Sequence, residues 1–125
     1  MIRTRIALHL LAAVFVLSAC TSMNNPMVKK SDGVLVNDAG MTLYTFDKDA
    51  AGSGKSACAG QCAVAWPAVP ATAASYPAPY SVVTRDDGSK QLAWKGKPLY
   101  LYAQDTRPGE RKGDNFKDVW HVVAD

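Results

Sequence analysis

The chain of 125 residues is poor in the groups that enzyme chemistry most often uses. It has two histidines, and His121 is the one that lies beyond the first 19 residues. It contains no nucleophile elbow, no HExxH motif and no glycine-rich phosphate loop. One histidine leaves few routes to general acid–base catalysis. These absences argue against an enzyme, and they imply no cofactor.

Long apolar runs and strongly basic stretches are also scarce. A helix needs ~20 apolar residues to span a bilayer. The apolar run at 6–19 is shorter and is interrupted by His9, so an uncleaved transmembrane anchor is disfavoured. Basic residues occur at most in pairs after the first five residues, as at Lys29-Lys30. This pattern argues against a nucleic-acid partner.

The first 20 residues have the parts of a secretory signal that ends in a lipobox. Two early arginines precede the apolar run, and the small residues Ser18 and Ala19 precede Cys20. The pattern predicts a signal peptide at 1–19 and acylation of Cys20, which makes the membrane a partner through a lipid anchor. Thr21 follows in place of an aspartate. By the sorting rule of enteric bacteria, we expect export to the outer membrane, facing the periplasm.

Removal of 19 of the 125 residues leaves 106, which is the size of one small domain. Residues 20–31 have no apolar period, and we expect them to form a lipidated flexible tether. Residues 32–125 then form a single β domain. The stretch 67–79 is rich in alanine and proline, and it is typical of an irregular connector.

The fold class predicted for this domain is all-β. Six short segments have strand character, and turn residues separate them. They are 34–36, 42–46, 81–84, 91–94, 99–102 and 119–123. Hairpin turns are expected at Gly40 and at Lys95-Gly96. No segment of helical length and period follows the signal.

An internal duplication is the next feature. Residues Gly40–Asp49 align without gaps on Gly96–Asp105, with the same glycine, leucine, tyrosine and aspartate. Further on, Trp66 corresponds to Trp120. A unit of some 40 residues is too small to bury its own face. We therefore expect two similar β-meander units, at about 33–70 and 88–125, that share one core.

The duplicated segments carry the pattern Y-x-(F/W/Y)-x-x-D. Its residues are Tyr44, Phe46 and Asp49, and again Tyr100, Tyr102 and Asp105. Together with Cys58-x-x-x-Cys62 and the following Trp66-Pro67, this doubled motif resembles a family of predicted bacterial lipoproteins, the secreted repeat of unknown function. The resemblance runs from about Gly33 to Val123. It implies an exported, often lipid-anchored, repeated domain that has no agreed activity.

The motif aromatics have two interpretations. Tyr44 and Phe46 fall on one face of their strand while Leu43 falls on the other, and Tyr100 and Tyr102 repeat the arrangement. Strands that are apolar on both faces are typical of a central position covered from each side. Core packing is therefore favoured over a stacking platform for a sugar or a haem edge.

The motif aspartates also have two interpretations. Asp49 and Asp105 each open a loop that contains glycine, where a carboxylate can accept backbone N–H bonds. The alternative is a cation site that uses Asp105, Asp114 and Asp118, but this spacing does not follow an EF-hand loop. Loop fixing is the favoured role, and no metal site is predicted.

The two remaining cysteines, Cys58 and Cys62, form a disulfide by default in an oxidising compartment. Four steps along a strand span ~13 Å, whereas a disulfide needs Cα atoms within ~7 Å, so the segment must curl. Copper binding or thiol exchange is the alternative. Copper sites draw on further histidine or methionine ligands, and we expect His121 to face outward.

The function indicated by these patterns is a non-enzymatic structural or binding role in the cell envelope. One alternative is a periplasmic copper or thiol redox accessory protein that uses Cys58 and Cys62. Another is an envelope polysaccharide-binding module that uses Trp94 and the tyrosines. The charged loop from Asp105 to Asp118 is the expected contact for a partner, either an envelope protein or a polysaccharide.

Overall fold

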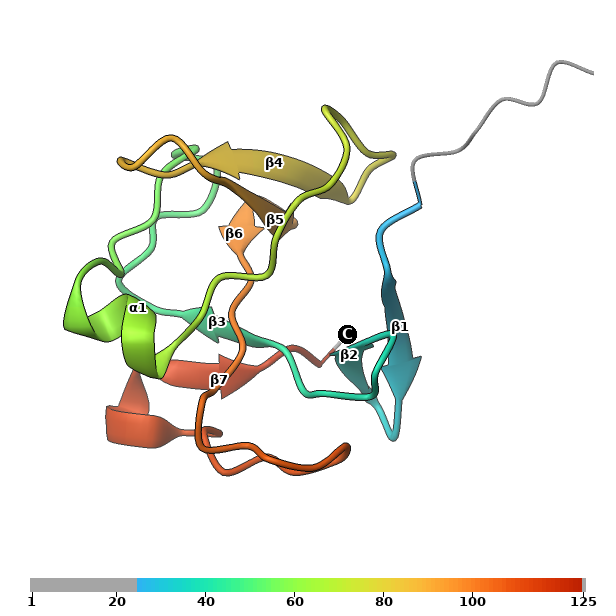
Figure 1. The fold of residues 1–125 in the computed structure, drawn as a ribbon. Helices are drawn as coiled ribbons and strands as arrows, with labels where there is room; N and C mark the ends of the chain where they lie inside the picture. The colour runs from blue at the N-terminus through green and yellow to red at the C-terminus, as the bar shows by residue number, and fades with distance from the viewer. Residues whose placement is uncertain (1–24, 125) are drawn as a thin grey trace, which may run out of the picture.

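A computed structural model describes residues 25–124, so Cys20 and the predicted signal peptide lie outside the described residues. Short strands dominate this range, which confirms the all-β class (Figure 1). The elements are β1 (Val28–Ser31), β2 (Val34–Asn37), β3 (Tyr44–Phe46), α1 (Gln61–Ala65), β4 (Tyr80–Thr84), β5 (Lys90–Trp94), β6 (Lys97–Pro98), the 3-10 turn η1 (Phe116–Asp118) and β7 (Trp120–Val122). Within residues 25–124, neither helical element has the length and apolar character that a bilayer span requires.

The strands form three small antiparallel sheets, ordered β1-β2, β3-β7 and β4-β5-β6. The hairpin turn predicted at Lys95-Gly96 joins β5 to β6. Its residues have φ values of 49° and 78°, and this pair of positive angles is typical of a two-residue turn that follows the strand twist. Gly40 also lies in a turn, where its N–H donates to the Asn37 carbonyl at 2.9 Å.

The two repeats exchange their edge segments. The motif strand β3 of the first repeat pairs with β7 at the end of the second, in the register Tyr44 to Val122 and Phe46 to Trp120. Reciprocally, the second motif segment pairs with the end of the first repeat, since Leu101 N–H donates to the Pro67 carbonyl at 2.7 Å. Each motif segment therefore has a pairing partner that comes from the other repeat.

The two motif segments meet at their tyrosines. Tyr44 N–H donates to the Tyr100 carbonyl at 2.8 Å, and Tyr100 N–H donates to the Tyr44 carbonyl at 2.9 Å. Around this bridge, the repeats are related by an approximate two-fold arrangement. In Figure 1, the C-terminal end of the described chain lies beside β2, where Leu35 N–H donates to the Val123 carbonyl.

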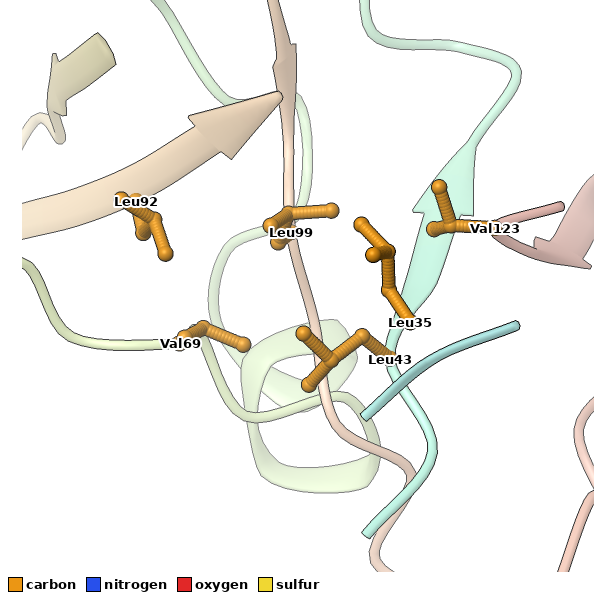
Figure 2. Packing of buried hydrophobic residues seen from close by; sticks show 6 residues of the cluster. All are labelled: Leu35, Leu43, Val69, Leu92, Leu99 and Val123. Carbon is orange, nitrogen blue, oxygen red and sulfur yellow. The ribbon is translucent and has the colours of Figure 1, made fainter. Parts of the chain in front are cut away.

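The core confirms that the repeats share their interior. Alternation along the motif strands sends leucines to one side and aromatic rings to the other, and both sides are buried. The leucine side receives three residues from each repeat, shown in Figure 2: Leu35, Leu43, Val69, Leu92, Leu99 and Val123. Each such side chain contributes ~1.5–3 kcal/mol on burial, so each repeat supplies half of a core that it cannot form alone.

Three predicted boundaries differ from the structure. The tether was expected to extend to residue 31, but Val28–Ser31 form β1. Residues 29–31 are exposed, and the strand is held by its backbone pairing with β2. Because no apolar face is buried, the sequence shows no apolar alternation there. The expected connector at 67–79 begins instead as an extended segment, because Ala68 bridges Tyr100 and Pro70 bridges Gln91.

The expected strand at 99–102 is also different. The regular strand β6 ends at Pro98, and the following residues make isolated bridges. The physical reason is that Tyr100 bridges two partners, Tyr44 and Ala68, which belong to different segments. The backbone there is hydrogen-bonded on both sides without a continuous ladder.

Candidate functional site

The motif tyrosines and aspartates cross-link the two repeats. Tyr44 Oη donates to Asp105 Oδ2 at 2.5 Å, and Tyr100 Oη donates to Asp49 Oδ2 at 2.5 Å. All four side chains are buried. The first residue of each motif therefore bonds to the last residue of the other motif, which gives the Y-x-(F/W/Y)-x-x-D pattern a structural reason.

The second oxygen of each aspartate holds the loop that follows it. Asp49 Oδ1 accepts the Ala57 N–H at 2.6 Å, and Asp105 Oδ1 accepts the Lys112 N–H at 3.0 Å. Burial, and then the hydrogen bond to a carboxylate, raises the pKa of the Tyr44 and Tyr100 phenols above the usual value. The tyrosines consequently remain protonated donors, as these contacts require.

Two of the three aspartates considered for a cation site, which were Asp105, Asp114 and Asp118, have other partners. Asp105 is engaged by Tyr44 and Lys112, and Asp114 Oδ1 accepts the Val122 N–H at 3.1 Å. Across residues 25–124, no group of three histidine, cysteine, aspartate or glutamate side chains is placed to hold a metal ion. His121 lies at the surface, with Nε2 2.8 Å from Asp47 Oδ2.

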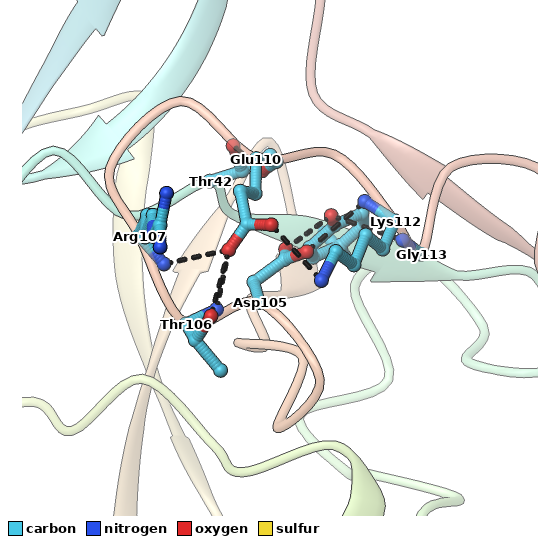
Figure 3. Close-up of polar contacts among 8 residues, drawn as sticks. Thr42, Asp105, Thr106, Arg107, Glu110, Lys112 and Gly113 are labelled. Carbon is cyan, nitrogen blue, oxygen red and sulfur yellow. Dashed lines mark hydrogen bonds and ion pairs between the residues drawn. The ribbon is translucent and has the colours of Figure 1, made fainter.

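The loop after the second motif is tied to itself, as Figure 3 shows. Glu110 Oε1 accepts the N–H groups of Thr106 and Arg107 at 2.8 and 2.7 Å, and Glu110 Oε2 lies 3.0 Å from Lys112 Nζ. The Lys112 contact, followed by these N–H donors, lowers the pKa of Glu110 to about 2. Thr42 Oγ1 donates to the Glu110 carbonyl at 2.7 Å and fastens the loop to the first repeat. Glu110 is therefore fully engaged within the loop, with Lys112 as its charged partner.

The loop after the first motif is closed covalently. Cys58 and Cys62 form the predicted disulfide, with an S–S distance of 2.06 Å and a Cα–Cα distance of 5.2 Å. The segment curls as the short Cα separation requires, because Cys62 lies in α1. Arg85, which directly follows β4, also holds this loop by donating to Ser56 Oγ at 3.1 Å and to the Cys58 carbonyl.

Four aromatic rings form a continuous stack across the two repeats. Trp66 and Trp120 lie face to face, with centroids 3.8 Å apart and planes within 2°. Phe46 covers the outer face of Trp120 at 4.1 Å, and Tyr102 covers the outer face of Trp66 at 4.1 Å. Each repeat contributes two rings, and the Trp66 to Trp120 correspondence in the sequence is the contact at the centre of the stack.

A groove of about 450 Å³ runs over this stack, between α1 and η1. In Figure 1, α1 lies at one end of the β3-β7 pair, and η1 directly precedes β7. The groove combines the stacked rings with polar side chains from both repeats. Its lining residues are Phe46, Lys48, Gln61, Cys62, Ala65, Trp66, Tyr102, Gln104, Phe116, Lys117, Val119 and Trp120. Its size falls in the range of ~300–1,000 Å³ that is typical of small-molecule sites.

The wall formed by η1 has an unusual backbone. Asn115, Lys117 and Asp118 have φ values of 60°, 50° and 57°, a left-handed conformation that residues other than glycine rarely adopt. Between them, Phe116 remains 36% exposed, with its ring 5.7 Å from that of Trp66. The strained turn therefore holds a large aromatic side chain at the edge of the groove.

Sequence reasoning did not find this groove. The polysaccharide alternative named Trp94, but Trp94 packs against the leucine cluster, and the Lys95 ammonium lies 4.5 Å above its ring. The motif tyrosines Tyr44 and Tyr100 are buried cross-links, and Tyr102 lines the groove. The available signal was the corresponding pair Trp66 and Trp120, whose mutual stacking brings the two repeat ends together.

Comparison with known proteins gives one match. The family model of the secreted repeat of unknown function matches residues 27–70 and 81–124. No curated protein and no solved structure matches the chain. The two matched segments together cover most of the sequence, and they contain both copies of the tyrosine and aspartate motif. The chain therefore belongs to the family of secreted repeats of unknown function.

Proposed function

We propose that the protein is an exported, lipid-anchored and non-enzymatic module that binds envelope polysaccharide in the groove over the aromatic stack. The observation that carries this proposal is the composition of the groove. It joins a floor of stacked aromatic rings to the exposed amides of Gln61 and Gln104 and the exposed ammonium groups of Lys48 and Lys117. Aromatic surface with a few polar groups at its edge suits a sugar ring.

Backbone strain supports the same site. A left-handed residue other than glycine costs ~1–3 kcal/mol and persists where the surrounding structure enforces it. Such residues cluster at ligand sites, and three of them surround Phe116. Packing of Phe116 in the core does not explain this strain, since Phe116 is the most exposed ring that lines the groove. A ligand that contacts Phe116 accounts for it.

The binding test uses the tryptophans themselves. Intrinsic fluorescence is titrated with fragments of envelope polysaccharide, for which Trp66 and Trp120 report from the groove. We expect a saturable change in emission. Phe116→Ala should weaken binding about tenfold, which is the loss expected for one aromatic anchor. Met27→Ala removes another exposed apolar side chain at a distant position, and it should bind as the wild type does.

Two outcomes would overturn the binding role. One is unchanged emission at saturating polysaccharide. The other is equal affinity for the wild type and Phe116→Ala, because the ligand would then bind elsewhere.

The anchor is tested separately in cells. Cys20→Ala removes the sulfur that would carry the diacylglyceryl group. A radioactive fatty acid should label the wild-type protein and leave the variant unlabelled. Cys62→Ala is the matched control, because it removes a cysteine from the folded domain and should keep the label. Equal label in the wild type and Cys20→Ala would exclude the anchor.

A further inference from the structure

We infer that the groove selects sugars that carry a carboxylate or phosphate, an inference that rests on the proposed function and adds the charge of the polysaccharide to it. The first observation is the charge of the lining. Lys48 and Lys117 are cationic, and no aspartate or glutamate lines the groove. The chain as a whole is nearly balanced, with 14 basic and 11 acidic residues. The positive charge is therefore a local feature of this surface.

Both ammonium groups are available to a ligand. Lys48 and Lys117 are exposed, and neither has a carboxylate partner within residues 25–124. Lys117 Nζ lies 5.6 Å from the centre of the Phe116 ring, which keeps the charge next to the exposed aromatic side chain. By contrast, Lys112 in the neighbouring loop is paired with Glu110. Lys48 and Lys117 are therefore free to meet an anion at the groove.

The aromatic floor also favours negative charge. Trp66 and Trp120 are covered on both faces by the other rings of the stack. Only their edges can meet the groove that they line. The edge of an aromatic ring carries the positive part of its quadrupole. The floor therefore attracts an anionic group in addition to the lysines.

The indole nitrogens add hydrogen-bond donors to these edges. Within residues 25–124, neither the Trp66 nor the Trp120 N–H makes a hydrogen bond, and no fully buried nitrogen in this range lacks a partner. Both indole N–H groups must then reach solvent. The lysines and glutamines give the groove several donors, and no acidic acceptor lines it. This donor set matches the oxygens of a carboxylate or phosphate.

The occupant is a sugar unit of an acidic polymer and not a small inorganic anion, because two further features of the groove suit a larger ligand. One is the size of the groove, about 450 Å³. The other is Phe116, an apolar contact at its edge that the body of a sugar ring can cover. Attraction between opposite charges also extends over ~8–10 Å at moderate ionic strength, so a charged polymer is drawn toward this surface.

The test compares one oligosaccharide in two charge states. The probes are an oligogalacturonate and the same oligosaccharide with its carboxylates methyl-esterified, so that size and ring contacts are matched. We expect the acidic form to bind at least tenfold more tightly than the ester at low salt. The difference should shrink as salt is raised, because exposed charges are screened.

Matched variants locate the effect. Lys48→Gln combined with Lys117→Gln should weaken binding of the acidic form about tenfold and leave binding of the ester unchanged. Lys29→Gln combined with Lys90→Gln removes the same charge from exposed positions outside the groove and should bind as the wild type does. Thermal unfolding of each variant checks that the fold is retained.

The outcomes separate this inference from the proposed function. Equal binding of the acid and the ester would overturn the charge selection and leave polysaccharide binding in place. Binding of neither form, nor of any other envelope polysaccharide, would overturn both. Tight binding of the acid that the Lys48 and Lys117 changes do not affect would place the anion elsewhere. Inorganic phosphate that competes as well as the oligosaccharide would overturn the assignment to a sugar.

Discussion

The two repeats share a motif and close the loop after it in different ways. In both, the motif aspartate accepts an N–H from the loop, from Ala57 in the first repeat and from Lys112 in the second. The first loop is then closed by the Cys58–Cys62 disulfide. The second has no covalent closure and is held by hydrogen bonds to Glu110. The comparison shows that the aspartate sets the start of the loop, and the rest of the loop is free to diverge.

The divergence continues at the next position. Ala57 and Lys112 are equivalent, so Cys58 and Gly113 are equivalent as well. Cys58 is fully buried in the aromatic cluster. A Cβ atom at Gly113 would lie 2.6 Å from Trp66 Cη2, so no side chain fits there. The groove consequently has one wall stabilised by a disulfide and another formed by a strained turn.

The largest expected effect concerns what the repeats have in common. Asp49→Ala leaves the Ala57 N–H without its acceptor, and it leaves the Tyr100 hydroxyl with Ser56 Oγ as its remaining partner. Since a buried group left unpaired costs ~1–3 kcal/mol, the free energy of unfolding in urea should fall by about 3 kcal/mol. Asp105→Ala should lose a similar amount through Tyr44 and Lys112.

A double-mutant cycle tests the crossed pairing directly. Asp49→Ala combined with Tyr100→Phe should show a larger coupling energy than Asp49→Ala combined with Tyr44→Phe, because Asp49 bonds to the tyrosine of the other repeat. Stronger coupling between Asp49 and Tyr44 would contradict the interlocked arrangement and favour repeats that are each closed on themselves.

An intermediate effect concerns the difference between the loops. Reduction of the disulfide should lower the free energy of unfolding by ~2 kcal/mol, because the closed loop is short and constrains the unfolded chain little. Denaturation with and without a reductant measures this change. The Cys58→Ala/Cys62→Ala double variant, which has no disulfide, should not respond to the reductant. A loss well above the expected value would mean that α1 supports the whole stack and not only its own loop.

The interior of this fold was predictable from the sequence, for a simple reason. Alternation along a strand has a period of two, and Leu43 and Tyr44 are both apolar, so both faces had to be covered. The curled Cys58–Cys62 segment followed from the reach of a disulfide. These features depend on residue type and spacing, which a sequence contains.

The partners of the backbone were not predictable in the same way. Nothing in the residue types says that Tyr44 pairs with Val122 of the other repeat, since a main-chain hydrogen bond is the same for any residue. The strand β1 was not predicted because its residues 29–31 are exposed and give no apolar pattern. The groove was not predicted because it depends on the stacking of Trp66 on Trp120, which are distant in the sequence.

The smallest expected effect separates the two loops by pH. Glu110 has a pKa of about 2 in the fold, against an ordinary value of 4.5. A lowered pKa means that the stabilisation is complete above pH 4.5 and disappears as the pH falls through about 2. The carboxyl chemical shift of Glu110 should therefore titrate with a midpoint near 2. The first loop is closed by a disulfide, which does not titrate, and it contains no glutamate that corresponds to Glu110.

The matched variant for this loop is Glu110→Gln, which keeps an oxygen acceptor for the Thr106 and Arg107 amides and loses the charge that faces Lys112. At pH 6, these two amides should exchange faster in the variant than in the wild type. Near pH 2, the two proteins should converge, because the wild-type carboxyl is then partly protonated. A midpoint near 4.5 in the wild type, or the same difference at both pH values, would show that hydrogen bonds alone hold this loop and that its charge adds nothing.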